Sequence, residues 1–394
     1  MHLGEHPDVR PALVDVLIPV YDGAATIEAS LRSLQAQTLQ DVRLLVIDDG
    51  STDGTLDIVR RLAAEDRRIV VLERRNGGIV DALNAGLAET RAEFVARLDA
   101  DDLSHPDRLE RQVDYLTSTP DCVAVSGAVR HIDGAGGVLK SEVHLASPDS
   151  ADPCSYPQVA PYLVHPFLMA RRAAMTAVGG YRHVFHAEDT DLYWRLAETG
   201  RLVNLDAVLG DYRMHAGSIT SSSIVNGRIA AVTSQRSGIS AQRRRTGRPD
   251  LEFHAEDLAA YQEAHTLEGM VAVGARGLDE QEARRLALSA SVKLLELAGY
   301  RPFELDAQDA AFVRRTWSRQ SSDMSAADRR LCTRMLSGTA ARLLHHGHAA
   351  SALRLAPPRT WSTVAVRYVA RAAMPPGVRT LLQRATGREL SFVK

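Results

Sequence analysis

Short apolar runs alternate with amphipathic segments along the first third of the chain. The apolar runs are β-rich and cover residues 14–18, 42–47, 69–72, 94–98 and 123–125. Between them, apolar side chains such as Ile27, Leu31 and Leu34 recur at the spacing of a helix with one buried face. Strands that are apolar nearly throughout, separated by such helices, predict an α/β fold with a mostly parallel sheet flanked by helices.

The pattern loosens after residue 125 and changes again near residue 240. Residues 131–137 are Gly-rich and predict a hairpin turn. Beyond residue 240 the periodicity is helical only, most clearly at 258–273, 280–297, 310–317 and 326–344. We therefore expect an α/β domain over residues 1–240 and an all-α C-terminal domain over residues 241–394.

Composition narrows the class of protein. The 394 residues are 45% hydrophobic and 24% charged with a formal net charge of -2, which is ordinary for a globular protein and gives no general reason to expect a nucleic-acid partner. The three cysteines show neither a zinc-ligand spacing nor a disulfide framework, which fits a reducing compartment. The first 23 residues carry acids and prolines and lack a long apolar core, so we do not expect a secretory signal there. No apolar run is long enough for a transmembrane helix. We expect a cytoplasmic protein.

The ligand crevice of a parallel sheet lies beyond the carboxyl ends of its strands. The loops that follow the first four predicted strands are 19–23, 48–51, 74–78 and 99–102, and three of these four loops carry carboxylates. A carboxylate-rich crevice is a poor place for a bare diphosphate unless a cation lies between them.

The sequence Asp99-Ala100-Asp101-Asp102 is the densest group of acids in these loops. Two acids separated by one residue can both reach one Mg²⁺ or Mn²⁺ ion, or one can hold the ion and the other a sugar hydroxyl. The alternative is a plain capped turn, because Asp is common before a helix and Ser104 can cap the segment that follows.

Three segments, 16–23, 46–55 and 96–102, occur in this order, each at the end of a predicted strand. With them the chain resembles the glycosyltransferases of family 2, inverting enzymes with a Rossmann-like GT-A fold that use nucleotide-diphosphate sugars. The resemblance covers about residues 14–222. It implies a metal site formed by Asp99, Asp101 and Asp102, with Asp99 also facing the donor.

The resemblance also implies a nucleotide site. Asp49 matches the acid that hydrogen-bonds the nucleobase, usually uracil, and a carboxylate accepts well from a ring N–H. The remaining residues that the resemblance places around the nucleoside or the donor sugar are Pro19, Tyr21, Asp22, Asn76 and Gly78. The alternatives are that Asp49 caps the helix after Ser51 and that Gly77-Gly78 is a plain turn.

Glu188-Asp189 matches the family's acidic pair, in which the aspartate is the catalytic base. Inversion in a single displacement needs a base that removes the proton of the acceptor hydroxyl as the new bond forms. The resemblance therefore implies that Asp189 is this base and that Glu188 holds the acceptor. The alternative is a pair of acids that complements a helix dipole. His165 fits the family pattern on the acceptor side and equally fits a structural role.

The segment 212–218, YRMHAGS, resembles the family's mobile loop that contacts the diphosphate. This implies that Arg213, His215 and Ser218 bind the leaving group, where arginine can bridge two phosphate oxygens. The alternative is a surface loop with incidental cations.

The last 41 residues are basic, with interleaved apolar side chains and a single acid, Glu389. Such a tail can bind an anionic membrane surface, form a solvated helical face or form a homo-oligomer contact, and the sequence favours none of the three.

Together these features predict an inverting transferase that moves sugar from a nucleotide-diphosphate donor, expected to be a UDP-sugar, to a hydroxyl of a glycan, a cell-surface polymer or a secondary metabolite. A nucleotidyltransferase would carry a cationic phosphate loop near its first strand, and residues 19–23 have none. The alternative within the fold is an inactive nucleotide-sugar-binding or scaffold protein.

Overall fold

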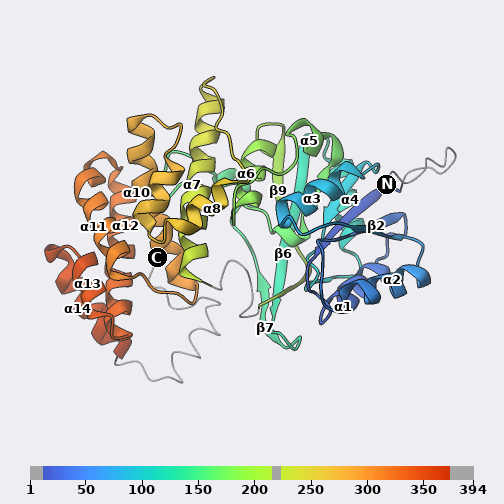
Figure 1. Ribbon diagram of the computed structural model, residues 1–394, viewed down its shortest axis with the longest axis horizontal. Helices are drawn as coiled ribbons and strands as arrows, with labels where there is room; N and C mark the ends of the chain where they lie inside the picture. The colour runs from blue at the N-terminus through green and yellow to red at the C-terminus, as the bar shows by residue number, and fades with distance from the viewer. Residues whose placement is uncertain (1–11, 215–222, 373–394) are drawn as a thin grey trace. The chain divides into compact units, whose positions relative to one another are not determined.

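The computed structural model describes residues 12–214 and 223–372, which divide into two compact units (Figure 1). The first unit comprises the described parts of Met1–Asp149, Pro161–Tyr181 and Arg195–Met214. The second comprises Ser150–Ala160, Arg182–Trp194 and the described part of His215–Lys394. Each unit is described by itself below.

The first unit is built on a nine-stranded sheet in the order β3-β2-β1-β4-β8-β6-β9-β5, with β7 paired to β6. Its strands are β1 Val14–Val20, β2 Val42–Asp48, β3 Ile69–Glu73, β4 Phe94–Arg97, β5 Leu103–Ser104, β6 Cys122–Ile132, β7 Val138–Val143, β8 Met169–Arg171 and β9 Arg201–Arg213. β1 to β4 are mutually parallel, β8 reverses, and β6 and β9 run parallel to each other and antiparallel to β8. Most strands therefore share one direction, which confirms the predicted mostly parallel sheet.

The five apolar runs of the sequence correspond to β1 to β4 and β6. β1 is buried at every residue. Its alternate residues from Val14 to Val20 share a core with α1, α2 and α4, while on the other face Gly86 of α3 lies against Leu17 and Ile47. Helices therefore cover both faces, as predicted. The helices of this unit are α1 Ile27–Gln35, α2 Thr55–Glu65, α3 Ile79–Ala88, α4 Arg108–Ser118 and α5 Arg172–Ala177.

The second unit is helical. After α6 (Glu188–Leu196), which crosses from this unit into the first, its helices are α7 Ile224–Arg245, α8 Asp257–Glu263, α9 Leu267–Gly274, α10 Glu280–Tyr300, α11 Ala307–Gln320, α12 Ala326–His345, α13 Ala349–Leu355 and α14 Trp361–Ala372. The apolar stripe on α10 lies in the core, and every one of Leu286, Leu288, Val292, Leu295 and Leu297 is buried. The expected division at residue 240 falls inside α7, so the compact units do not coincide with it. None of the helices in the described part of the chain is long and apolar enough to cross a membrane.

Candidate active site

Three carboxylates converge in the turn that follows β4. One ligand oxygen each from Asp99, Asp101 and Asp102 lies within 4.8 Å of the other two. Asp102 is buried, and its Oδ2 has no hydrogen-bond partner among the described residues. Burial, together with the negative charges of Asp99 and Asp101, raises the pKa of Asp102 well above its usual range. Three carboxylates that repel one another, one of them with a buried oxygen that lacks a partner among the described residues, are the kind of ligands that a hard divalent cation prefers.

Two arginines that were not predicted from the sequence contact this turn or the strand that precedes it. Buried Arg97, the last residue of β4, forms an ion pair of 2.5 Å with Asp99. Arg108, at the start of α4, is fully buried and donates a 2.6 Å hydrogen bond to the carbonyl of Arg97. Burial lowers the pKa of Arg108 to about 9, and its guanidinium also lies over the Phe167 ring. These contacts fix the direction in which the acidic turn leaves the sheet.

Arg213 lies directly against the acidic turn. β5 pairs with β9 in the register Leu103 to Asp211, which brings the end of β9 beside the turn. The main-chain N–H of Arg213 donates to Asp102 Oδ1 at 2.7 Å, and its Nε donates to the carbonyl of Asp101 at 2.8 Å. The structure thus brings together two predicted elements from distant parts of the sequence. His215 and Ser218, predicted on the same loop, lie outside the described residues.

The hairpin between β6 and β7, predicted at residues 131–137, contributes to this arrangement. Its turn carbonyls at Asp133 and Gly134 accept hydrogen bonds from Arg213 Nη1 at 3.0 and 2.9 Å. On β9, Asp211 accepts two 2.6 Å hydrogen bonds from Arg130 and lies 3.1 Å from His105 Nε2. Although burial opposes ionisation, these hydrogen bonds lower the pKa of Asp211. The end of β9 is therefore tied to β6 and to the segment after the acidic turn.

Asp49 organises the loop that follows β3. Its buried carboxylate accepts a 2.8 Å hydrogen bond from the N–H of Gly78 and a 3.1 Å hydrogen bond from that of Gly77, and forms a 3.0 Å ion pair with Arg74. Helix capping, the alternative for Asp49, is not what the structure shows: α2 begins at Thr55 with Gly54 as its N-cap and no side-chain cap, and Asp48 accepts a 3.3 Å hydrogen bond from the Ser51 N–H within the loop. Neither this loop role nor the Arg74 partner was predicted. Base recognition by Asp49 stays a prediction.

The loops after β1, β2 and β3 contact one another. Asp22 Oδ1 accepts a 2.7 Å hydrogen bond from the N–H of Thr52, so this carboxylate already has a partner within the protein. Gly50 adopts a φ of +81°, and a Cβ there would lie 2.9 Å from the main-chain nitrogen of Asn76. Only glycine permits this close approach. Pro19 is buried within β1, whereas Tyr21 is 52% exposed and Asn76 and Gly78 are also exposed.

His165 lies in the first unit, in a short 3₁₀ turn before β8. Its Nε2 is 2.9 Å from the Tyr181 hydroxyl, and both side chains are buried. Burial, assisted by the positive charge of Arg97, lowers the pKa of His165 well below its usual range. A buried, neutral imidazole that is hydrogen-bonded to a tyrosine fits a structural role for His165. Contact of His165 with the acceptor stays a prediction.

Glu188 and Asp189 open helix α6 in the second unit, and both are half-buried. Asp189 Oδ1 accepts a 2.6 Å hydrogen bond from the N–H of Thr190. The third acid of this turn, Asp191, is fully buried and accepts a 2.9 Å hydrogen bond from Arg182 Nε. Asp191 therefore anchors the helix start, and the roles of Asp189 as base and of Glu188 as acceptor contact stay predictions.

The chain matches glycosyl transferase family 2 over residues 15–179. It is 30% identical over 210 residues to the amylovoran biosynthesis glycosyltransferase AmsE of Erwinia amylovora, covering 52% of this chain and 77% of that protein. It is 26% identical over 207 residues to the hyaluronan synthase of Pasteurella multocida, covering 52% of this chain but only 21% of the synthase. This chain thus spans about a fifth of that relative's length.

Among solved structures, the chain resembles the mannosyltransferase PcManGT from Pyrobaculum calidifontis in complex with GDP-Man and Mn²⁺, with a TM-score of 0.48 and 20% identity, covering 93% of this chain and 87% of that one. It also resembles S. aureus TarS 1-349 in complex with UDP-GlcNAc, with a TM-score of 0.46 and 17% identity, covering 91% and 92%. The sequence match to AmsE, over most of that protein's length, decides the assignment. The chain belongs to glycosyl transferase family 2.

Proposed function

We propose that this glycosyltransferase is an inverting, divalent-metal-dependent enzyme that moves sugar from a UDP-sugar to an acceptor hydroxyl of a polysaccharide under synthesis. The observation that carries the proposal is the convergence of Asp99, Asp101 and Asp102 on a volume small enough for one cation. The main-chain N–H and guanidinium of Arg213 lie against the same turn.

The donor would lie over the carboxyl ends of β1, β2 and β4. The Asp49 carboxylate, oriented by Gly77, Gly78 and Arg74, would accept from the base, and exposed Tyr21 offers a ring on which the base can stack. Uracil presents one ring N–H to such an acceptor. Guanine also presents N–H groups to a carboxylate, so UDP and GDP must be compared directly.

The residues of the acidic turn fit a divalent cation, because three carboxylates converge and a buried Asp102 oxygen lacks a partner among the described residues. Asp101 would bind the ion with help from Asp99 or Asp102. When bound, Mn²⁺ or Mg²⁺ supplies positive charge that offsets the negative charge of the leaving diphosphate. Arg213 would supply a second positive charge to the same leaving group, with His215 and Ser218 as further phosphate contacts.

We propose Asp189 as the base. Its carboxylate is only half-buried and its neighbour Asp191 already serves as the structural anchor, so Asp189 can face an acceptor. It would take the proton from the acceptor hydroxyl while the C–O bond to the leaving diphosphate breaks, and Glu188 would hold the acceptor. A single displacement inverts the anomeric carbon and needs no covalent enzyme intermediate.

The proposal is tested with a panel of UDP- and GDP-sugars, Mn²⁺ or Mg²⁺, and hydroxyl acceptors of increasing length. Transfer or slow donor hydrolysis should appear with one nucleotide class, and NMR of the product should show the anomeric configuration opposite to that of the donor. Retention of configuration would overturn the single displacement. Binding of donor by a chain that never turns over any acceptor would favour the inactive scaffold.

A further inference from the structure

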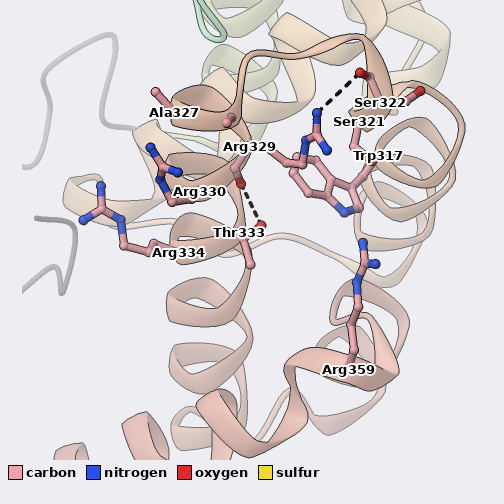
Figure 2. A pocket seen from close by; sticks show the side chains of 10 residues that line it. Trp317, Ser321, Ser322, Ala327, Arg329, Arg330, Thr333, Arg334 and Arg359 are labelled. Carbon is pink, nitrogen blue, oxygen red and sulfur yellow. Dashed lines mark hydrogen bonds between the residues drawn. The ribbon is translucent and has the colours of Figure 1, made fainter.

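The helical unit contains an arginine-rich groove at the junction of α11, α12 and the 3₁₀ turn Pro358–Thr360 (Figure 2). The groove has a volume of about 940 Å³. It is lined by Trp317, small and hydroxyl side chains, and four arginines, Arg329, Arg330, Arg334 and Arg359. No acidic residue lines it.

No described carboxylate pairs with the arginines of this groove. Among the described residues, Arg330, Arg334 and Arg359 form no ion pair with a carboxylate, and Arg329 donates to the main-chain carbonyls of Ser322 and Met324. Nearby arginines behave differently: Arg342 on the same helix pairs with Glu304 at 2.9 Å, and Arg315 on α11 pairs with Glu268 at 2.6 Å. Figure 2 shows Arg330 and Arg334 on successive turns of α12, pointing to the same side.

The positive charges of the groove also affect arginines outside it. Burial and the neighbouring Arg359 lower the pKa of Arg314, and burial and Arg334 lower that of Arg367. Mutual repulsion of this kind is relieved when an anion binds among the arginines.

Apolar side chains are exposed on the adjoining helices α13 and α14. Val366, Leu353 and Val369 are 69%, 65% and 61% exposed, more than any other large hydrophobic side chain of the described residues. Val364 buries the opposite face of α14, and Arg367 Nη1 donates to the carbonyl of Arg334 at 3.3 Å, which joins this helix to the arginine-bearing side of α12. No acid occurs between residues 354 and 372.

We infer that the surface formed by the groove arginines and the exposed face of α13 and α14, here called the basic-apolar surface, docks on a bilayer of anionic phospholipids. The arginines would contact headgroup phosphates while Leu353, Val366 and Val369 enter the boundary between headgroups and acyl chains. A soluble anionic polymer would use the arginines alone. The exposed valines therefore favour a lipid surface, and this inference does not depend on the donor or the chemistry proposed above.

Flotation of the full chain with lipid vesicles tests the inference. We expect binding to phosphatidylcholine vesicles containing phosphatidylglycerol, weak binding to pure phosphatidylcholine, and release by salt. Each basic side chain near an anionic surface strengthens partitioning by about five-fold, so R330Q/R334Q/R359Q should lose about 10²-fold. V366S/V369S should lose about ten-fold.

The matched control is R248Q/R284Q/R315Q, which removes the same number of charges from similarly exposed arginines of the same unit that are already paired with acids. It should bind nearly as wild type, and thermal unfolding should be unchanged in all three variants, because the substituted side chains are exposed. L353S is a further variant of the same face should V366S/V369S unfold.

Four results would overturn the inference. The first is absence of binding to anionic vesicles. The second is an equal loss in the control variant, which would indicate a response to net charge only. The third is loss in the arginine variant with full binding by V366S/V369S. The fourth is complete competition by inorganic phosphate at low concentration. Either of the last two would assign the groove to a soluble anion.

Discussion

The main-chain N–H of Arg213 donates a 2.7 Å hydrogen bond to Oδ1 of Asp102, although 111 residues separate them in the sequence. The contact forms because the pairing of β5 with β9 places the end of β9 beside the acidic turn. One consequence is that Arg213, which we propose binds phosphate, and the acids that we propose bind the metal are held together by the same strand pairing. A change in either should therefore affect diphosphate binding.

Arg213→Ala should weaken UDP binding by about 10- to 100-fold, because a charge-assisted hydrogen bond to phosphate is lost. Uridine binding should change little. The main-chain contact to Asp102 survives this substitution, whereas the guanidinium contacts to the Asp101 carbonyl and to the hairpin carbonyls are lost, so thermal unfolding of the variant is measured alongside. Calorimetric titration of UDP and uridine measures both effects, with Arg213→Lys as a control that keeps the charge without the two-pronged geometry. Equal weakening of UDP and uridine would contradict the assigned role.

Asp189→Asn should lower transfer by about 10²–10⁴-fold, because the amide cannot accept the acceptor proton. Donor affinity should stay close to wild type, since the acid is proposed to face the acceptor. Initial rates of transfer, together with donor titration, separate the two effects. Glu188→Gln is the paired control and should raise KM for the acceptor more than it lowers kcat. A wild-type rate in Asp189→Asn would require another base.

Asp49→Asn should destabilise the protein by about 1–3 kcal/mol, because Gly77, Gly78 and Arg74 lose the carboxylate that they share. UDP affinity should fall as well, since the loop that faces the base is no longer held. Asp48→Asn is the control: within the described part of the chain this neighbouring acid accepts from the Ser51 N–H alone, and the substitution should affect UDP affinity far less. Thermal unfolding and UDP titration of both variants provide the comparison. Unchanged values for Asp49→Asn would refute this account of the loop.

Asp66 predicts a specific dependence of stability on pH. Hydrogen bonds from Arg68 and Gln35 lower the pKa of Asp66 to about 2. Because the folded-state pKa lies below the unfolded value, the stabilisation is fully present above about pH 4 and is lost as the pH falls toward 2. Asp66→Asn should cost about 1–2 kcal/mol at pH 7 and roughly half of that at pH 3. Urea unfolding at the two pH values measures this, with exposed Asp114→Asn as control; a pH-independent loss would rule out the ion pair as its cause.

The sequence was sufficient for the elements that depend on local pattern. β1 to β4 are apolar nearly throughout, so their positions in the chain and their parallel arrangement follow from the pattern, and the acids that follow β4 are close together in the chain. β5 and β8, with two and three residues, are too short to show a pattern and are defined only by the strands with which they pair. β7 has six residues, but its side chains are mostly exposed, so no apolar run marks it.

The supporting residues of the site could not be predicted for a related reason. Arg97 is a charged residue at the end of an apolar strand. Its role follows from its ion pair with Asp99 and from the pairing of β4 with β8, a strand that lies far along the chain. Asp22 and Asp49 were correctly singled out as loop acids. Their partners, however, are main-chain N–H groups of other loops, and main-chain donors leave no trace in the sequence.

The central claim is that Asp99, Asp101 and Asp102 bind a divalent cation on which donor binding depends. Calorimetric titration of UDP into the wild-type chain and into Asp101→Asn, each with Mn²⁺ and with EDTA, tests it most directly. We predict measurable UDP binding only for wild type with Mn²⁺, and a folded Asp101→Asn variant, by circular dichroism, that binds as weakly as wild type in EDTA. Equal UDP affinity for wild type in Mn²⁺ and in EDTA would contradict the claim.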